Sequence, residues 1–332
     1  MLITILTEGS IDWGIGHICR CLAFYDAFLN EGFDVRFIIH GDTSVTSLLS
    51  NRNVEYIPWL EDIALLKNCI KDEVVFMDSI QADQSMVDFL QNHVYKLIVI
   101  DDYRRRYYRD SIIIDWTPNV ENSHRHKWNS SNLYLLGLQY SVLRNAFNLK
   151  SFYTVKPSVT SVFIIMGGTD VRGLTIPIVS SLLNSYSTLQ YNIVIGSRTH
   201  VDLSLLNNRN IRFFYSLDAE HMKTLMLESD VAISAGGQTL YELASVGLPT
   251  IAIQVVDNQS EDISGFLKKG TLSNAFQWDD PYLFEHLIQE LRKLFSFERR
   301  KFISDTSLSL SVGEGMISIV QVIKENLGLC WF

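Results

Sequence analysis

Short apolar runs recur along the whole chain, and segments with the apolar spacing of helices lie between them. In the first half the helical spacing is clearest at residues 18–30, and apolar runs occupy residues 2–6, 34–39, 74–78 and 97–101. Runs of this kind, without polar alternation, are typical of strands buried on both faces. Strands that alternate with helices predict a parallel sheet with helices on both of its faces.

The same pattern restarts after Lys156, Pro157 and Ser158. A helical segment covers residues 175–184, and further apolar runs occupy residues 161–166, 191–195, 211–214, 231–234 and 250–254. Because 332 residues are too many for one ordinary core, we expect two domains. The sequence therefore predicts an α/β protein with two Rossmann-like domains facing across a cleft, at residues 1–150 and 156–332.

The formal net charge of −9 argues against a nucleic acid or an anionic membrane as the partner. No apolar run approaches the roughly 20 residues of a membrane span, and the first residues lack the basic stretch of a signal peptide. The spacing of Cys19, Cys21, Cys69 and Cys330 fits neither a zinc site nor a disulfide framework. We therefore expect a cytoplasmic protein. The sequence carries no signal for an oligomeric state.

A glycine loop follows the apolar run at 231–234. Its residues and the polar residue of the following helix are Ser234, Ala235, Gly236, Gly237, Gln238, Thr239 and Glu242. Glycines let the backbone approach an anion, and the first free N–H groups of a helix point toward it. Gln238 and Thr239 add side-chain donors, and Glu242 is placed to accept from ribose hydroxyls. The loop suggests a site for a nucleotide diphosphate, although a plain strand-to-helix turn would also use the glycine pair.

A second glycine loop, with Gly14, Gly16 and His17, precedes the first helix. In a doubly wound sheet this loop lies at the carboxyl edge of the strands, where ligands bind. The helix dipole is expected to lower the pKa of His17, so that its neutral form could act as a general base. A histidine that only hydrogen-bonds the loop would fit the same residues. Cys19 stands where a dinucleotide fingerprint needs its third glycine, which disfavours a nicotinamide dehydrogenase.

Two further loops follow strands of the second domain. Gly167, Gly168 and Thr169 come at the end of the run at 161–166, where they could contact a diphosphate or sugar, or form a capped tight turn. Asn258 and Gln259 follow the run at 250–254. An amide pair at that position suits recognition of hydroxyl or amide groups, and it suits a solvated loop equally well.

Carboxylates end two strands of the first domain, Asp78 in one and Asp101 with Asp102 in the other. They could orient His17 or hold a sugar, or they could cap helices. Without a compact group of Cys and His they do not predict a metal site. The run at 104–106, three arginines, is predicted to be a solvated face.

Five segments resemble, in order, those of one family, the PseG-type UDP-2,4-diacetamido-2,4,6-trideoxy-β-L-altropyranose hydrolases. Residues 14–21, which include Arg20, are similar to the family's Gly-x-Gly-His-x-x-Arg-Cys opening. The other segments are residues 140–147, 166–170, 234–242 and 247–259. The resemblance spans about the first 260 residues.

The resemblance implies a fold similar to that of the MurG-type GT-B glycosyltransferases and a role in pseudaminic acid biosynthesis. It implies hydrolysis of the bond between the anomeric carbon and UDP, with His17 as the base that activates water and with inversion of the anomeric centre. The loop at 234–239 is implied to hold the diphosphate, Glu242 the ribose, and Asn258 and Gln259 the sugar. The other residues assigned to substrate binding are Gly14, Gly16, Arg20, Asp78, Gly167, Gly168 and Thr169. Neither a metal nor another cofactor is expected.

The chain departs from the family at Ile80, where many members carry Tyr, and at Trp13, which is bulkier than expected. These residues bear on the sugar rather than on the reaction. The alternative function is a GT-B glycosyltransferase with a UDP-amino sugar donor, in which His17 deprotonates an acceptor hydroxyl. A third reading, a nucleotide-sugar binding protein without catalysis, would leave His17 without a role.

Overall fold

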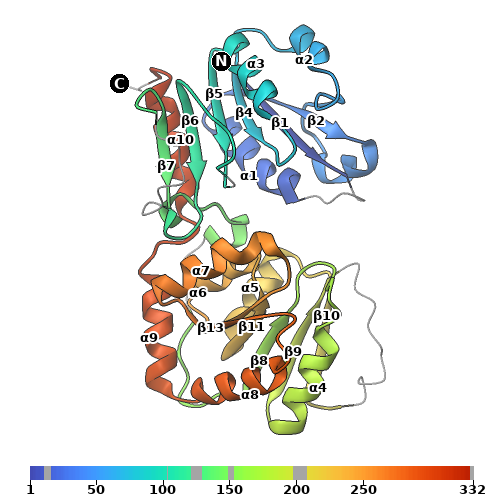
Figure 1. Cartoon of the computed structure of the whole chain (residues 1–332), viewed down its shortest axis with the longest axis vertical. Helices are drawn as coiled ribbons and strands as arrows, with labels where there is room; N and C mark the ends of the chain where they lie inside the picture. Colours follow the sequence, from blue (N-terminus) through green and yellow to red (C-terminus); the bar gives the residue numbers. More distant parts are fainter. Residues whose placement is uncertain (11–15, 103, 121–128, 149–152, 197–207, 330–332) are drawn as a thin grey trace. The chain divides into compact units, whose positions relative to one another are not determined.

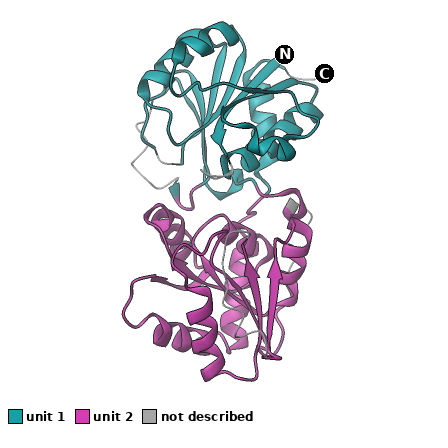
Figure 2. Ribbon diagram, turned by 90° about the vertical axis from the view of Figure 1, so that its right-hand side faces the viewer, with its two compact units in different colours: residues 1–116, 120–142, 314–332 teal, residues 117–119, 143–313 magenta. Residues whose placement is uncertain are grey.

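The chain forms two compact units in a computed structural model, which describes residues 1–10, 16–102, 104–120, 129–148, 153–196 and 208–329. Unit 1 comprises residues 1–116, 120–142 and 314–332, and unit 2 comprises residues 117–119 and 143–313 (Figure 2). Each unit is built around one parallel sheet (Figure 1). The predicted fold class, an α/β protein with two Rossmann-like domains, is confirmed.

Unit 1 has a seven-stranded sheet with the order β3-β2-β1-β4-β5-β6-β7. Its strands are β1 (Leu2–Gly9), β2 (Asp34–Gly41), β3 (Val54–Tyr56), β4 (Val74–Asp78), β5 (Lys96–Ile100), β6 (Ser111–Asp115) and β7 (Leu133–Leu136). Its helices are α1 (Gly16–Asn30), α2 (Ile63–Cys69), α3 (Gln84–His93) and α10 (Gly315–Asn326). Alternate residues of β4 face opposite sides: Phe76 packs on Phe24 of α1, while Val75 belongs to a core that includes Leu66 of α2.

The last helix returns to the first unit. Gly315, the first residue of α10, donates its N–H to the carbonyl of Ser141, and Val142 pairs with Glu314 in an antiparallel bridge. A Cβ on Gly315 would lie 2.3 Å from the carbonyl carbon of Tyr140, so this close approach requires glycine. The sequence assigned all of residues 156–332 to the second domain. In the structure residues 314–332 belong to unit 1. The sequence could not predict this, because an amphipathic pattern does not specify which sheet a helix covers.

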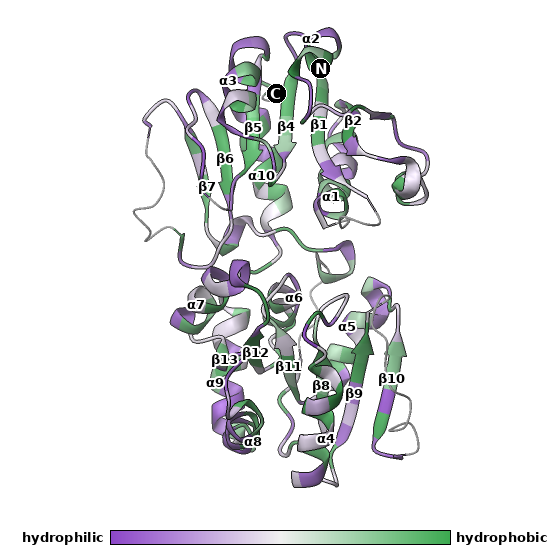
Figure 3. Cartoon of the chain, turned by 45° about the vertical axis from the view of Figure 1, so that its right-hand side comes forward, coloured by the Kyte–Doolittle hydropathy of each residue, from purple (hydrophilic) through white to green (hydrophobic). Residues whose placement is uncertain are grey.

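Unit 2 has a six-stranded sheet with the order β10-β9-β8-β11-β12-β13. Its strands are β8 (Ser161–Ile165), β9 (Gln190–Ile195), β10 (Ile211–Tyr215), β11 (Val231–Ala235), β12 (Thr250–Gln254) and β13 (Leu272–Gln277). Its helices are α4 (Thr175–Ser185), α5 (Ala219–Glu228), α6 (Thr239–Val246), α7 (Ser260–Lys269), α8 (Leu283–Lys293) and α9 (Phe297–Leu308). The strands of both sheets are largely hydrophobic, as buried parallel strands must be (Figure 3).

Both strand orders are those of a doubly wound sheet. Each sheet starts at an inner strand, adds two strands to one side, and then continues on the other side. The order reverses between β1 and β4 in unit 1 and between β8 and β11 in unit 2. Ligands of such sheets bind beyond the carboxyl ends of the strands at this reversal. Each unit therefore offers one expected ligand position.

Candidate active site

His17, the predicted base, and Asp78, predicted to bind substrate, meet at the reversal of the strand order in unit 1. His17 is the second residue of α1, beyond the carboxyl end of β1, and Asp78 is the last residue of β4. His17 Nδ1 and Asp78 Oδ1 are 2.9 Å apart. Gly14 and Trp13 lie outside the described residues, whereas Gly16 begins α1.

Arg20 holds the carboxylate of Asp78 from the same helix. Its Nε donates to Oδ2 at 2.8 Å and its Nη2 to Oδ1 at 2.5 Å, while Nη1 donates to Asp102 at 3.1 Å. Burial raises the pKa of Asp78, but Arg20 and His17 outweigh burial and hold that pKa well below its usual range. Asp78 is therefore an ionised carboxylate, although its residue is only 1% exposed.

The pKa of His17 follows from this carboxylate. Burial lowers it, but the hydrogen bond and the negative charge of Asp78 outweigh burial and raise the pKa above its ordinary value. The predicted lowering by the helix dipole is wrong, because the sequence did not show that a buried carboxylate contacts the ring. An ionised Asp78 keeps the proton on Nδ1, so Nε2 is the nitrogen that can accept one. The side chain is 26% exposed, which leaves the ring accessible.

Glu8, near the end of β1, organises the loop after Asp78 and was not singled out from the sequence. Its carboxylate accepts from the hydroxyl of Ser79 and from the backbone N–H groups of Ile80 at 3.0 Å and Gln81 at 3.2 Å. Glu8 is 3% exposed. Three donors from one loop compensate the burial of this carboxylate and fix the backbone that follows Asp78. A charged residue near the end of an otherwise uncharged first strand was the signal for it.

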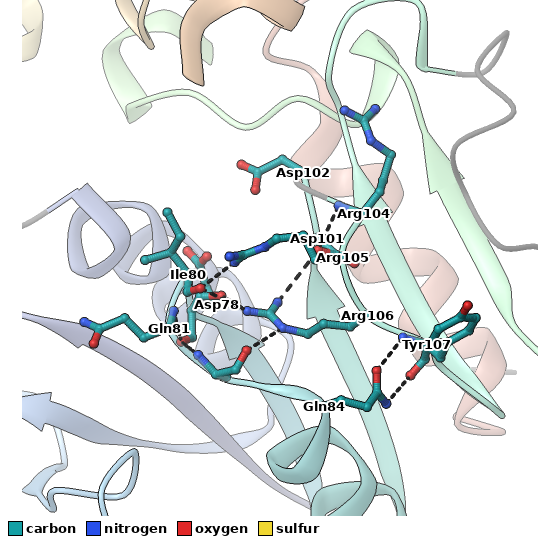
Figure 4. Close-up of polar contacts among 12 residues, drawn as sticks. Asp78, Ile80, Gln81, Gln84, Asp101, Asp102, Arg104, Arg105, Arg106 and Tyr107 are labelled. Carbon is teal, nitrogen blue, oxygen red and sulfur yellow. Dashed lines mark hydrogen bonds and ion pairs between the residues drawn. The ribbon is translucent and has the colours of Figure 1, made fainter. Parts of the chain in front are cut away.

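The arginine run at 104–106 is only partly a solvated face, because Arg105 is exposed whereas Arg104 and Arg106 are paired inside unit 1. Arg106 is 7% exposed and donates to the carbonyls of Ala82 and Ser79, each at 2.7 Å (Figure 4). Arg104 forms an ion pair with Asp115 at 3.2 Å. Arg106 connects the loop after β4 with the loop after β5, and Gln84 at the start of α3 makes two hydrogen bonds with the backbone of Tyr107, at 2.8 and 3.0 Å (Figure 4). The prediction is wrong for Arg104 and Arg106, because the sequence did not show the buried carboxylate and carbonyls that pair with them.

The predicted diphosphate loop of unit 2 lies at the carboxyl end of β11, at the reversal of the strand order. Ser234 is buried within β11 and its hydroxyl donates to the carbonyl of Ala235, so it is engaged inside the strand. The N–H of Gly236 donates to Ile253 in β12 at 3.0 Å. Gly237, Gln238 and Thr239 form the partly exposed turn that starts α6. This turn, rather than Ser234, is the part of the loop that an anion can approach.

Glu242 is engaged by Arg144 in this structure. Arg144 Nε donates to Oε1 at 2.7 Å and Nη2 to Oε2 at 2.9 Å, a bidentate pair. Glu242 is 3% exposed, and burial raises its pKa while Arg144 lowers it. Arg144 belongs to the segment at 140–147, whose role the sequence did not specify. Binding of ribose by Glu242 stays a prediction, and it would have to coexist with this ion pair or replace it.

The remaining predicted residues of unit 2 lie at the same edge of its sheet. Gly167, with φ of 80°, and the exposed Gly168 and Thr169 follow β8. Gln259 accepts from the N–H of Val255 at 2.8 Å and lies beside the glycine loop, since a Cβ on Gly236 would be 3.1 Å from its Cβ. Asn258 is exposed on the same short turn. The loops after β11 and β12 are therefore adjacent, and the loop after β8 lies at the same edge of the sheet.

Within the part of the chain that the structure describes, no group of three or more His, Cys, Asp or Glu residues could hold a metal ion. Of the helices described, none is long and apolar enough to cross a membrane.

No protein-family model matches the chain. Uncharacterized protein MJ1062 of Methanocaldococcus jannaschii is 25% identical over 98% of this chain and 71% of its own length. The spore coat polysaccharide biosynthesis protein SpsG of Bacillus subtilis is 20% identical over 98% of both chains. The pseudaminic acid cytidylyltransferase and UDP-2,4-diacetamido-2,4,6-trideoxy-β-L-altropyranose hydrolase of Helicobacter pylori is 23% identical over 78% of this chain, and the match spans 45% of that protein.

Solved structures share the fold over nearly the whole chain. The glycotransferase of kitacinnamycin has a TM-score of 0.69 at 12% identity and covers 98% of both chains. MurG of Acinetobacter baumannii has a TM-score of 0.66 at 13% identity and covers 98% of this chain and 99% of its own. MnaA of S. aureus, solved with UDP, has a TM-score of 0.65 at 12% identity and covers 99% of this chain and 97% of its own. These likenesses show a GT-B-like fold.

Proposed function

We propose that this chain is a UDP-sugar hydrolase, with UDP-2,4-diacetamido-2,4,6-trideoxy-β-L-altropyranose as its substrate in pseudaminic acid biosynthesis. The observation that carries the proposal is the contact of His17 Nδ1 with Asp78 at 2.9 Å, in a site where Arg20 keeps Asp78 ionised. A histidine oriented through Nδ1 presents Nε2 as a general base. The hydrolase activity named for the Helicobacter pylori relative supports this choice.

The diphosphate of UDP, which is the leaving group, is proposed to bind to unit 2. Gly237, Gln238 and Thr239 start α6 at the reversal of the strand order, where backbone N–H groups meet the positive end of a helix dipole. Donors of this kind stabilise the charge that develops on a departing diphosphate. MnaA, which shares the fold, was solved with UDP, and this supports a nucleotide diphosphate as the ligand.

The reaction requires one displacement. His17 Nε2 takes a proton from water as the water oxygen forms a bond to the anomeric carbon. The bond between that carbon and the diphosphate oxygen breaks, and its electron pair leaves with UDP. Because no covalent enzyme intermediate forms, the anomeric centre is inverted. UDP is a good leaving group, so a general acid is not required.

The test is hydrolysis of the UDP-amino sugar in ¹⁸O-water without any acceptor, followed by NMR and mass spectrometry. We expect equal amounts of UDP and free sugar, with ¹⁸O on the sugar and an inverted anomeric signal. His17→Gln should lose about 10²- to 10⁴-fold in rate, as expected for removal of a general base. His221→Gln, which changes an exposed histidine of α5, is the matched control.

Two results would contradict the proposal. Label in the phosphate would mean that water attacks phosphorus rather than carbon. Binding of the UDP-sugar without turnover until an acceptor is added would instead favour the glycosyltransferase alternative, in which the same base deprotonates an acceptor hydroxyl.

A further inference from the structure

Arg172 lies in unit 2 and belongs neither to the cluster of His17 and Asp78 nor to the glycine loop. It lies in the turn between β8 and α4 and is exposed. Its Nε donates to the carbonyl of Val255 at 2.9 Å, and its guanidinium lies over the ring of Trp278, 3.9 Å from the ring centroid. A cation at this distance from an indole face is well placed for a cation–π interaction. Two contacts from different segments therefore hold the side chain in one orientation.

The strand order shows that these contacts span the position of the glycine loop. Arg172 follows β8, Val255 follows β12 and Trp278 follows β13, and β11 lies between β8 and β12. The loop that leaves β8 and the side chain of Arg172 together therefore reach across the carboxyl end of β11 to Val255 and Trp278. The glycine loop begins at that end. Gln259 provides an independent link, because it accepts from the N–H of Val255 and its amide nitrogen would be 3.9 Å from a Cβ on Gly237.

The charge of Arg172 is not neutralised by a carboxylate among the described residues. Asp170, the acid nearest in sequence, accepts from the N–H groups of Leu174 and Thr175 and caps α4. Asp280, beyond Trp278, accepts from His286. Val255 and Trp278 occupy Nε and one face of the guanidinium, which leaves its two terminal nitrogens as donors. A planar fork of such donors matches the oxygens of a phosphate.

We propose that Arg172 binds the diphosphate of the nucleotide, as the cationic part of the subsite formed by the turn at Gly237, Gln238 and Thr239. Trp278 is a positioning residue, which holds the guanidinium without touching the ligand. The inference rests on the proposed function in one respect, the identity of the nucleotide. The chemistry that it assigns to Arg172 is recognition of a diphosphate anion.

The test compares the binding of uridine, UMP, UDP and inorganic pyrophosphate by calorimetry to the wild type and to Arg172→Gln. We expect Arg172→Gln to weaken the binding of UDP about ten- to a hundredfold, because charge-assisted hydrogen bonds are lost. The binding of pyrophosphate should weaken as well, whereas the affinity for uridine should be unchanged. Trp278→Leu keeps the guanidinium but removes the ring on which it lies, so it should weaken the binding of UDP less than Arg172→Gln does. The matched control is Arg212→Gln. Arg212 lies near the amino-terminal end of β10, whereas the glycine loop lies at the carboxyl-terminal ends of the strands.

The outcomes separate the inference from the proposed function. If the wild type and Arg172→Gln bind UDP equally, the inference is overturned while the hydrolase proposal stands. If the wild type binds pyrophosphate but not UDP, and Arg172→Gln loses pyrophosphate, the anion subsite stands and the nucleotide assignment falls. A loss of thermal stability in Arg172→Gln with unchanged preference for UDP over uridine would mean that the residue only anchors its loop.

Discussion

His17 Nδ1 lies 2.9 Å from Asp78 Oδ1, and this contact raises the pKa of His17 and helps to lower the pKa of Asp78. The neutral, basic form of His17 is populated above its raised pKa, so the rate of hydrolysis should fall as the pH drops through that value. The contact also orients the ring, because a hydrogen bond at Nδ1 fixes both the tautomer and the direction of Nε2.

Asp78→Asn should lower the rate about a hundredfold and move the acidic limb of the pH profile to lower pH. Without the carboxylate, burial and the charge of Arg20 both lower the pKa of His17. The measurement is kcat/KM against pH for both proteins. An acidic limb at the same pH in wild type and variant would mean that the titrating base is not His17.

Asp78 should also make stability depend on pH in the acidic range. Its pKa in the folded protein is lower than in the unfolded chain, so it contributes stability above about pH 4 and loses that contribution as the pH falls below this value. The free energy of unfolding of Asp78→Asn should be lower than that of the wild type near neutral pH, by about 3 kcal/mol, because Arg20, whose side chain is 17% exposed, loses one of its two carboxylate partners. Urea titrations across the range from about pH 7 to about pH 3 check this. A gap between the two proteins that stays constant over this range would contradict it.

Strand positions were largely predictable because buried parallel strands are continuous apolar runs. The run at 74–78 is β4 and the run at 250–254 is β12, residue for residue. Glycine loops beyond such strands then had to lie at the carboxyl edge of a sheet. The strand at β6 carries the same signal in Ser111–Asp115, but it was not assigned.

Side-chain pairing was not predictable, because it joins residues far apart in the chain. Arg144 and Glu242 are 98 positions apart, and Arg20 and Asp78 are 58 apart. Nothing local distinguishes a paired arginine from a solvated one, which is why the pairing of Arg104 and Arg106 was not predicted. The sequence identified His17 as a base but could not supply the carboxylate contact that sets its pKa.

If Glu242 binds the ribose, Glu242→Ala should weaken the binding of UDP and abolish the discrimination between UDP and its 2′-deoxy analogue. The comparison with Arg144→Ala is decisive, since this variant breaks the same ion pair but keeps the carboxylate. Calorimetry with both nucleotides on both variants separates the two roles. If both variants lose stability and both keep the wild-type preference for UDP, Glu242 serves the ion pair alone.

Hydrolysis should persist after chelation of metal ions. We propose that backbone N–H groups of the turn at 237–239 and the guanidinium of Arg172 stabilise the charge that develops on the leaving diphosphate, so no metal ion is needed. The rate after dialysis against EDTA should equal the rate before it. Recovery of a lost rate on addition of Mg²⁺ would show instead that a metal ion shares this role.

Gly236 and Gly237 should respond differently to substitution by alanine. A Cβ on Gly236 would lie 2.3 Å from Ile263 Cδ1, so the buried Ile263 side chain of α7 would have to move, and Gly236→Ala should cost about 1–3 kcal/mol of unfolding free energy. The nearest atom to a Cβ on Gly237 is Gln259 Nε2 at 3.9 Å, an ordinary contact, so Gly237→Ala should be nearly neutral in stability. Ile263→Ala in the Gly236→Ala background should recover part of the loss, because it removes the clashing atoms. Thermal unfolding of the four proteins tests whether packing against α7, rather than approach of an anion, requires the first glycine of the pair. Equal stability of the two single variants would contradict this account.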